Sequence, residues 1–243
     1  MIVCIDSGNT RVKWAAHDGA GWLSPGAASH TDLAALAALP GTLPEPRLVM
    51  VANVAGAAAA AAIENALAGW RQRFAWVRSE AAACGVTNGY ANPAALGVDR
   101  WCALVGARTL TAAACLVVGA GTATTVDSLD ARGHFQGGLI VPGFDLMRMA
   151  LARNTAGLPL ADGNYTPLPA TTEDAIFSGC LEAQLGAIER AFSRLAGEPG
   201  ANCLIFGGAA PLLARHLTMP HRRVDGLVLE GLLAMARLRV NHS

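Results

Sequence analysis

The chain has 243 residues, of which 53% are hydrophobic and 15% charged, and its 18 basic side chains balance its 18 acidic ones. This composition excludes a disordered chain, and the lack of a Lys/Arg cluster argues against a nucleic-acid partner. No apolar stretch reaches the roughly 18–20 residues that a membrane span needs, and the N-terminus lacks the basic region of a signal peptide. The 6 scattered cysteines contain no Cys-x-x-Cys pair, which indicates a reducing compartment and no zinc site. We therefore expect a globular cytoplasmic protein with no membrane association.

The first half is predicted to begin with a buried strand over Met1–Ile5, paired after a turn with a second strand over Val12–His17. Thr31 is expected to cap a helix over Asp32–Leu39, which Pro40-Gly41 ends. Further along, the pattern predicts strands over Arg47–Val51 and Phe74–Val77 and a helix over Ala57–Trp70. Asn92-Pro93 and Gly97 make 90–100 a loop, followed by a helix over Trp101–Thr109.

The second half repeats the opening pattern of a strand, a glycine turn and a second strand. Strands are expected over Cys115–Val118, Thr122–Leu129, Phe135–Val141 and Cys203–Phe206. Helices are expected over Phe144–Arg153, Glu173–Leu195 and Gly226–Arg239, with a short one from Pro211. We therefore predict two similar domains, 1–113 and 114–243, with the last helix packing back on the first domain.

The first strand runs into a polar turn whose residues suit a phosphate group. The turn reads Asp6, Ser7, Gly8, Asn9, Thr10, Arg11, Val12 and Lys13. Glycine lets the backbone approach an anion, hydroxyls and a lysine add hydrogen bonds and charge, and a carboxylate such as Asp6 can hold Mg²⁺. The alternatives are an Asx turn at Asp6 and a solvated lysine at position 13.

The second glycine turn offers a second phosphate contact at Thr122, which follows Gly121 as Thr10 follows Asn9. Thr124 and Thr125 fit ordinary strand positions, and Asp127 either faces a crevice or caps the strand end. Later in the chain, Gly207-Gly208 between a strand and a helix either accepts a flat adenine ring or serves close packing.

The segment from Tyr90 to Arg100 carries the residues suited to a second substrate. Gly97 frees the backbone to present Val98, Asp99 and Arg100 together, and a carboxylate such as Asp99 can accept a proton from a substrate hydroxyl. Arg100 can pair with a carboxylate or phosphate, or simply with Asp99. Thr172, at the start of a long helix, is either part of an N-cap or a contact to a polar substrate.

Together these motifs resemble the type III pantothenate kinases, within the acetate/sugar kinase–Hsp70–actin superfamily. The specific part is the Asp-x-Gly-Asn-Thr start at Asp6 combined with Leu96-Gly97-Val98-Asp99-Arg100, and the resemblance follows the chain in order through Gly121-Thr122, 137–143, Thr172 and Gly207-Gly208. It implies an α/β fold of two tandem ribonuclease-H-like (actin-like ATPase) domains with mixed sheets. The implied reaction is phosphoryl transfer from ATP to pantothenate, the first step of coenzyme A synthesis.

The resemblance also implies roles for individual positions. Residues 6–13 and Thr122 resemble ATP contacts, Asp99 the proton acceptor, and Tyr90, 97–100 and Thr172 the pantothenate contacts. It further implies a homodimer with the substrate site at the interface, a divalent cation such as Mg²⁺, and a monovalent cation, K⁺ or NH₄⁺. Many members carry an acid for that cation where this chain has Gly119, so we expect its K⁺ dependence to be weakened or absent. Two other functions fit less well: an accessory transcription regulator, and a superfamily kinase for another small hydroxylated substrate such as a sugar.

Overall fold

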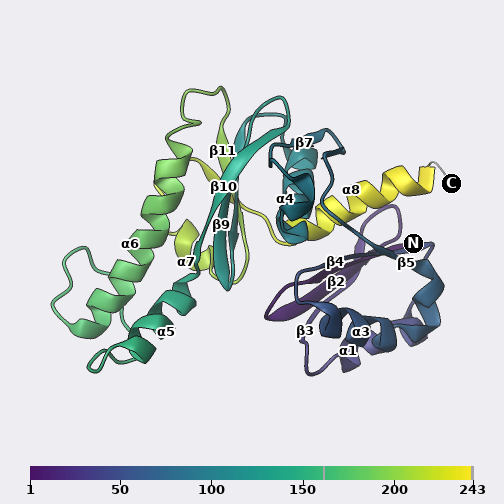
Figure 1. The fold of residues 1–243 in the computed structure, drawn as a ribbon, viewed down its shortest axis with the longest axis horizontal. Coiled ribbons are helices and arrows are strands. Elements are labelled where there is room, and N and C mark those ends of the chain that lie inside the picture. The colour runs from purple at the N-terminus through teal and green to yellow at the C-terminus, as the bar shows by residue number, and fades with distance from the viewer. Residues whose placement is uncertain (161, 242–243) are drawn as a thin grey trace. The chain divides into compact units, whose positions relative to one another are not determined.

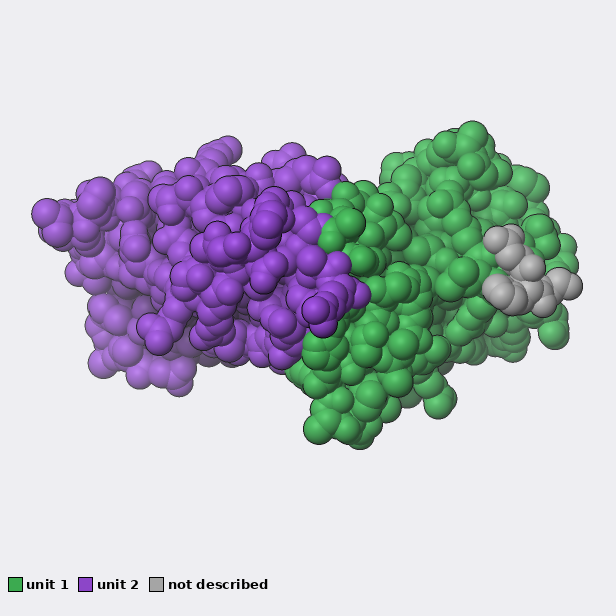
Figure 2. Space-filling view, turned by 90° about the horizontal axis from the view of Figure 1, so that it is seen from above, with its two compact units in different colours: residues 1–112, 133–135, 226–243 green, residues 113–132, 136–225 purple. Residues whose placement is uncertain are grey.

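The computed structural model describes residues 1–160 and 162–241. The chain divides into two compact units, shown in green and purple in Figure 2. The first comprises Met1–Ala112, Gly133–Phe135 and the segment from Gly226 onward, and the second comprises Ala113–Arg132 and Gln136–Asp225. Among the described residues, no helix combines the length and apolar character that a membrane span requires.

A mixed five-stranded sheet forms the centre of the first unit, in the order β3-β2-β1-β4-β5. β1 pairs antiparallel with β2, as predicted, and parallel with β4. The edge strand β3 was not predicted, because Pro25-Gly26 interrupts its alternation; an edge position tolerates this break. The strands are β1 Ile2–Ser7, β2 Arg11–His17, β3 Trp22–Ser29, β4 Leu48–Asn53 and β5 Phe74–Trp76.

Side-chain alternation along β1 assigns its residues to two faces of this sheet. Val3 and Ile5 join the core beneath the short helices, whereas Cys4 and Asp6 face the opposite layer of α4 and α8, in which Cys102 lies. Figure 1 shows α1 and α3 on one side of these strands and α8 on the other. The helices of this unit are α1 Ala34–Ala37, α2 Leu39–Thr42, α3 Ala57–Ala66, the 3₁₀ helix η1 Ala68–Arg73, α4 Val98–Leu110 and α8 Leu227–Asn241.

Three predicted helices of this unit differ from the observed ones. The helix expected over Asp32–Leu39 is two single turns, and Pro40 lies at the start of the second instead of ending the first. Thr31 does not cap it, since the N-cap residue is Leu33. The helix expected over Ala57–Trp70 becomes 3₁₀ after Leu67, and α4 begins at Val98 instead of Trp101.

Helices α4 and α8 cross at two glycines, Gly106 and Gly231. A Cβ atom built on Gly231 would lie 1.8 Å from the carbonyl oxygen of Cys102, and one built on Gly106 would lie 2.2 Å from that of Leu227. The two backbones are therefore in direct contact, a distance that only glycine permits. This crossing fixes α4, whose first turn carries Asp99 and Arg100, to its neighbouring helix.

The second unit contains strands in the order β12-β11-β8-β9-β10, covered by α5, α6 and α7 around a separate apolar core. All four strands predicted for the second half are present. The elements are β8 Cys115–Ala120, β9 Ala123–Leu129, β10 His134–Pro142, α5 Phe144–Asn154, α6 Thr172–Phe192, β11 Asn202–Phe206, α7 Ala210–Ala214 and β12 His221–Arg223. The first residues of β10, His134 and Phe135, belong to the first unit, where they pair with β7 (Val86–Asn88). The short strand β6 (Ala82–Ala83) pairs with the other edge of β7.

Candidate active site

The first polar turn joins β1 to β2. Its backbone closes where the Gly8 N–H donates to the Arg11 carbonyl at 3.1 Å. Asp6 lies directly opposite Lys13 in the antiparallel register, so both side chains lie on the sheet face that α4 covers. A Cβ on Gly8 would meet nothing nearer than the Arg11 oxygen at 3.6 Å, an ordinary contact. The fold itself therefore does not require glycine here, which favours a role in close approach to a ligand.

Asp6 and Asp99 lie close enough to repel each other. The pKa of Asp6 is raised to about 6: burial raises it most, the charge of Lys13 lowers it, and the charge of Asp99 raises it. A buried carboxylate with a raised pKa, next to a second carboxylate, favours a cation. Among the described residues no three His, Cys, Asp or Glu side chains form a metal cluster. Asp6 therefore fits a divalent cation that takes its other ligands from phosphate oxygens and water.

Asp99 is held at the start of α4, in the first turn of the helix. Its Oδ1 accepts a hydrogen bond of 2.8 Å from the Arg100 backbone N–H. A Cβ on Gly97, the N-cap residue, would lie 2.7 Å from that same oxygen. Gly97 is thus needed for this position of the carboxylate. Its role is steric, and Val98 is already helical, so Asp99 stands on a rigid element and not in a loop.

The Arg100 guanidinium lies against two aromatic rings. Arg100 is only 6% exposed, and its Nη1 donates to the Tyr90 hydroxyl at 2.8 Å. Its Cζ lies 5.5 Å from the Tyr90 ring centre and 5.9 Å from that of Phe135, and the two rings are 5.4 Å apart. Cation–π attraction and the hydrogen bond both hold the guanidinium in one orientation.

The loop from 89 to 97 is anchored by side chains behind it. The buried Asn88 donates to the carbonyls of Glu80 and Pro93 and accepts from the Tyr90 N–H. Asn88 is also paired with Phe135, and a Cβ on Gly89 would lie 2.1 Å from the Phe135 carbonyl oxygen. Phe135 thus supports both the backbone and the side chains of this segment.

In the second unit, the turn at Thr122 is held by two glycines that cannot be replaced. The Gly143 N–H donates to the Thr122 carbonyl at 2.9 Å, and a Cβ on Gly143 would lie 2.1 Å from the Gly121 oxygen. Gly207 has φ +103°, and its Cβ would lie 2.3 Å from the Ala120 oxygen. The structure therefore brings the exposed Thr122 turn beside the strand–helix turn at Gly207, an arrangement that suits a nucleotide. Asp127 is buried in β9, which agrees with a role inside the sheet.

Gly119 lies close to the side chains of two neighbouring strands. A Cβ there would lie 2.9 Å from the Thr125 hydroxyl and 3.0 Å from the Phe206 ring. A side chain here would require the Thr125 hydroxyl or the Phe206 ring to shift.

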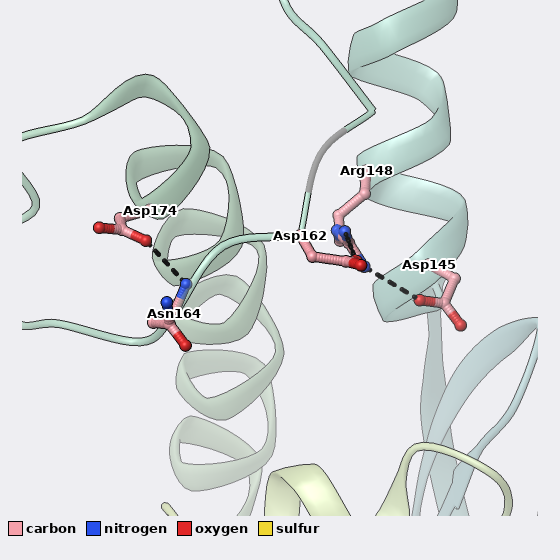
Figure 3. Close-up of polar contacts among 5 residues, drawn as sticks. All are labelled: Asp145, Arg148, Asp162, Asn164 and Asp174. Atoms are coloured by element: carbon pink, nitrogen blue, oxygen red, sulfur yellow. Dashed lines mark hydrogen bonds and ion pairs between the residues drawn. The ribbon is translucent and has the colours of Figure 1, made fainter.

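Thr172 occupies the first turn of α6, but Thr171 is the capping residue. The Thr171 hydroxyl accepts from the Asp174 N–H at 3.2 Å, so the helix does not require the Thr172 hydroxyl. Beside it, Asp174 accepts from the Asn164 N–H at 2.7 Å. Figure 3 shows this contact, together with the Arg148 side chain between Asp145 and Asp162.

The first unit thus brings together Asp6, Lys13 and Asp99, and beside Asp99 on α4 it places Arg100 with Tyr90. Thr122, Thr172 and Gly119 belong to the second unit. Sequence reasoning missed two residues near the first group. Phe135 lies under Arg100, and the ring of His30 contacts the Gly8 carbonyl. Neither residue belongs to a sequence motif near the site, because the pairing of distant strands brings each of them there.

The comparisons with known proteins agree with this geometry. The family model described as "Type III pantothenate kinase" matches residues 2–194. A protein of that name from Dechloromonas aromatica is 55% identical over 236 residues, covering 97% of this chain and 99% of the relative. One from Aromatoleum aromaticum is 56% identical over 237 residues, covering 98% of each chain.

Among solved structures, a conserved putative Baf family transcriptional activator from Campylobacter jejuni matches with a TM-score of 0.67 at 17% identity, covering 98% of this chain and 99% of that one. This likeness shows the fold alone. The predicted fold class is confirmed: two mixed α/β sheets, with solved neighbours of the actin-like ATPase fold. The match over most of the sequence and the two close relatives show that the chain belongs to the type III pantothenate kinase family.

Proposed function

We propose that this chain transfers the γ-phosphoryl group of ATP to the hydroxyl of pantothenate, giving 4′-phosphopantothenate in the first step of coenzyme A biosynthesis. The observation that carries the proposal is that the carboxylates of Asp6 and Asp99 lie close together, beside the turn that ends at Lys13. One carboxylate would hold a cation and the other would accept a proton, as phosphoryl transfer to an alcohol requires. The names of relatives that are more than half identical point to the same acceptor.

The proposal assigns a role in phosphate binding, proton transfer or metal binding to each of the following side chains. Lys13 and the turn from Asp6 to Val12, with Thr122, would bind the ATP phosphates. Asp99 would accept the proton as the substrate oxygen bonds to the γ-phosphorus and the bond to the bridging oxygen of ADP breaks. Mg²⁺ held by Asp6 and the phosphates would neutralise their charge.

The acceptor would lie along the segment that Arg100 and Tyr90 present. Arg100, held by two rings, would pair with the pantothenate carboxylate, and Gly97 and Val98 would leave the backbone open beside Asp99. Thr172 would contribute a hydroxyl from α6 that the helix does not need for its own cap.

We also propose that the two compact units act as the two domains of a kinase that works as a cytoplasmic homodimer. The absence of a disulfide among the described cysteines fits a reducing compartment. Sedimentation of the purified protein at micromolar concentration tests the dimer.

We further propose that K⁺ or NH₄⁺ dependence is weak or absent in this chain. Gly119 supplies no carboxylate, and a Cβ there would already contact the Thr125 hydroxyl and the Phe206 ring closely. Turnover measured in buffers with and without K⁺, at constant ionic strength, should differ by less than about twofold. Strict activation by K⁺ would contradict the proposal.

A coupled ATP-consumption assay tests the main proposal. Pantothenate should support steady turnover, whereas acetate and simple sugars at the same concentration should not. Preferred turnover of a sugar would replace pantothenate as the acceptor while leaving the kinase chemistry intact.

A further inference from the structure

His30 reaches the first phosphate turn from a neighbouring strand. It directly follows β3, whose last residue, Ser29, is paired with Arg11 of β2. From there the imidazole extends over the turn, and its Nε2 lies 2.7 Å from the carbonyl oxygen of Gly8. This short contact joins residues far apart in the chain. It reaches the backbone of Gly8, where the absence of a side chain would let the ATP phosphates approach.

The partner of the ring decides its tautomer. A carbonyl oxygen can only accept, so Nε2 carries the proton and donates it. The other ring nitrogen, Nδ1, is buried and has no hydrogen-bond partner among the described residues. Within that part of the chain, the polar contact of the His30 ring is therefore the Gly8 carbonyl.

The contact at the Gly8 carbonyl also sets the orientation of the next amide, the N–H of Asn9. In a trans peptide the C=O of Gly8 and the N–H of Asn9 point in opposite directions. A carbonyl held toward His30 therefore directs the Asn9 N–H away from it. Glycine adopts a wide range of backbone angles, and a Cβ on Gly8 would meet only an ordinary contact at 3.6 Å. The His30 contact therefore adds a constraint on this peptide besides the bond from the Gly8 N–H to the Arg11 carbonyl.

We propose that His30 is a positioning residue for ATP: its hydrogen bond to the Gly8 carbonyl holds the Gly8–Asn9 peptide so that the Asn9 N–H faces the nucleotide phosphates. This inference rests on the ATP site of the proposed function, but not on the identity of the acceptor. His30 itself does not touch the reacting atoms.

The test compares three variants by calorimetric binding of a non-hydrolysable Mg²⁺–ATP analogue and by steady-state kinetics. His30→Ala removes the donor, and the dissociation constant of the analogue and the KM for ATP should rise roughly 3- to 10-fold, the effect of one hydrogen bond. The KM for pantothenate should stay unchanged. His30→Gln keeps an N–H donor at similar reach and should recover most of the affinity.

Thr31→Ala is the matched control. It removes the neighbouring contact between the Ser29 and Thr31 hydroxyls, which are 2.9 Å apart, without touching the Gly8 carbonyl. Its affinity for the analogue should equal that of the unmodified protein. Thermal melting of all three variants separates positioning from folding.

The outcomes test the role of His30 independently of the identity of the phosphoryl acceptor. Unchanged analogue binding by His30→Ala overturns the inference, and so does an equal loss in His30→Gln accompanied by the same drop in melting temperature. If pantothenate is not phosphorylated but the analogue binds, the proposed acceptor fails, and the comparison of the variants still tests His30.

Discussion

Replacing Gly231 by alanine should separate α4 and α8, the two helices that cross at Gly106 and Gly231. The added Cβ would lie 1.8 Å from the Cys102 carbonyl oxygen, 2.7 Å from its carbon and 3.0 Å from the Gly106 nitrogen. These are backbone atoms, so no side chain can rotate to make room. The helices must move apart by more than 1 Å, on the order of the shortfall from an ordinary contact.

The cost can be estimated from opposing terms. Alanine is favoured over glycine inside a helix by about 1 kcal/mol. Overpacking of a closed core costs about 1–3 kcal/mol or more, and here it also opens the buried contact around Cys102 and Leu232, both 0% exposed. The backbone clash lies at the upper end of that range, so we expect a net loss of about 2 kcal/mol.

Gly186→Ala provides the control, because Gly186 is also helical but a Cβ there meets nothing within 4 Å. It should be neutral or stabilise by about 0.5–1 kcal/mol through helix propensity alone. Urea unfolding and thermal melting of both variants give the comparison. Because α4 carries Asp99, Gly231→Ala should also lower turnover at saturating substrates. A Gly231→Ala protein as stable as Gly186→Ala would refute the close crossing of α4 and α8.

Three further predictions concern the site itself. The folded-state pKa of Asp6, about 6, lies above its ordinary 3.8, so the ligand-free, metal-free protein should lose about 2–3 kcal/mol of stability as pH rises from about 4 to 6. Urea unfolding across this range should show that loss for the unmodified protein but not for Asp6→Asn; parallel curves would contradict the buried carboxylate. Asp99→Asn should keep ATP affinity while turnover falls about 10²- to 10⁴-fold, and an unchanged rate would remove Asp99 from proton transfer. Phe135→Leu should raise the KM for pantothenate roughly 3- to 10-fold with the KM for ATP unaltered, whereas Phe135→Tyr keeps the ring and should not; equal effects of both variants would exclude the cation–π contact.

Local patterns in the sequence were sufficient for most of the elements. A continuous apolar run predicts β1 and β8, and the turns at Gly8 and Gly121 follow from glycine and polar residues at strand ends. The pairing of β1 with β2 also follows, because two consecutive strands joined by a short turn usually lie side by side in the sheet. The predicted start of α4, Trp101, lies three residues after the observed start, Val98. Gly97 was interpreted as a loop residue, whereas it is the N-cap of this helix.

Contacts between distant residues were not predictable in the same way. Trp22–Ser29 does not read as a strand, so nothing placed His30 over the Gly8 carbonyl. Phe135 reads as one more apolar strand residue, and only the register of β10 with β7 puts its ring under Arg100. The raised pKa of Asp6 likewise depends on tertiary structure, because it comes from burial and from the charge of Asp99 on a different element.

The sequence by itself therefore indicated the family, the two-sheet fold and the candidate site residues, because periodicity, glycine turns and motif spacing are local properties of the chain. Only the tertiary structure decided what holds those residues in place: His30 on the turn, Phe135 under the guanidinium, and two glycines that let α8 touch α4. The physical reason is that packing and strand register join residues far apart in the chain, and the side chain of either partner alone does not reveal the other.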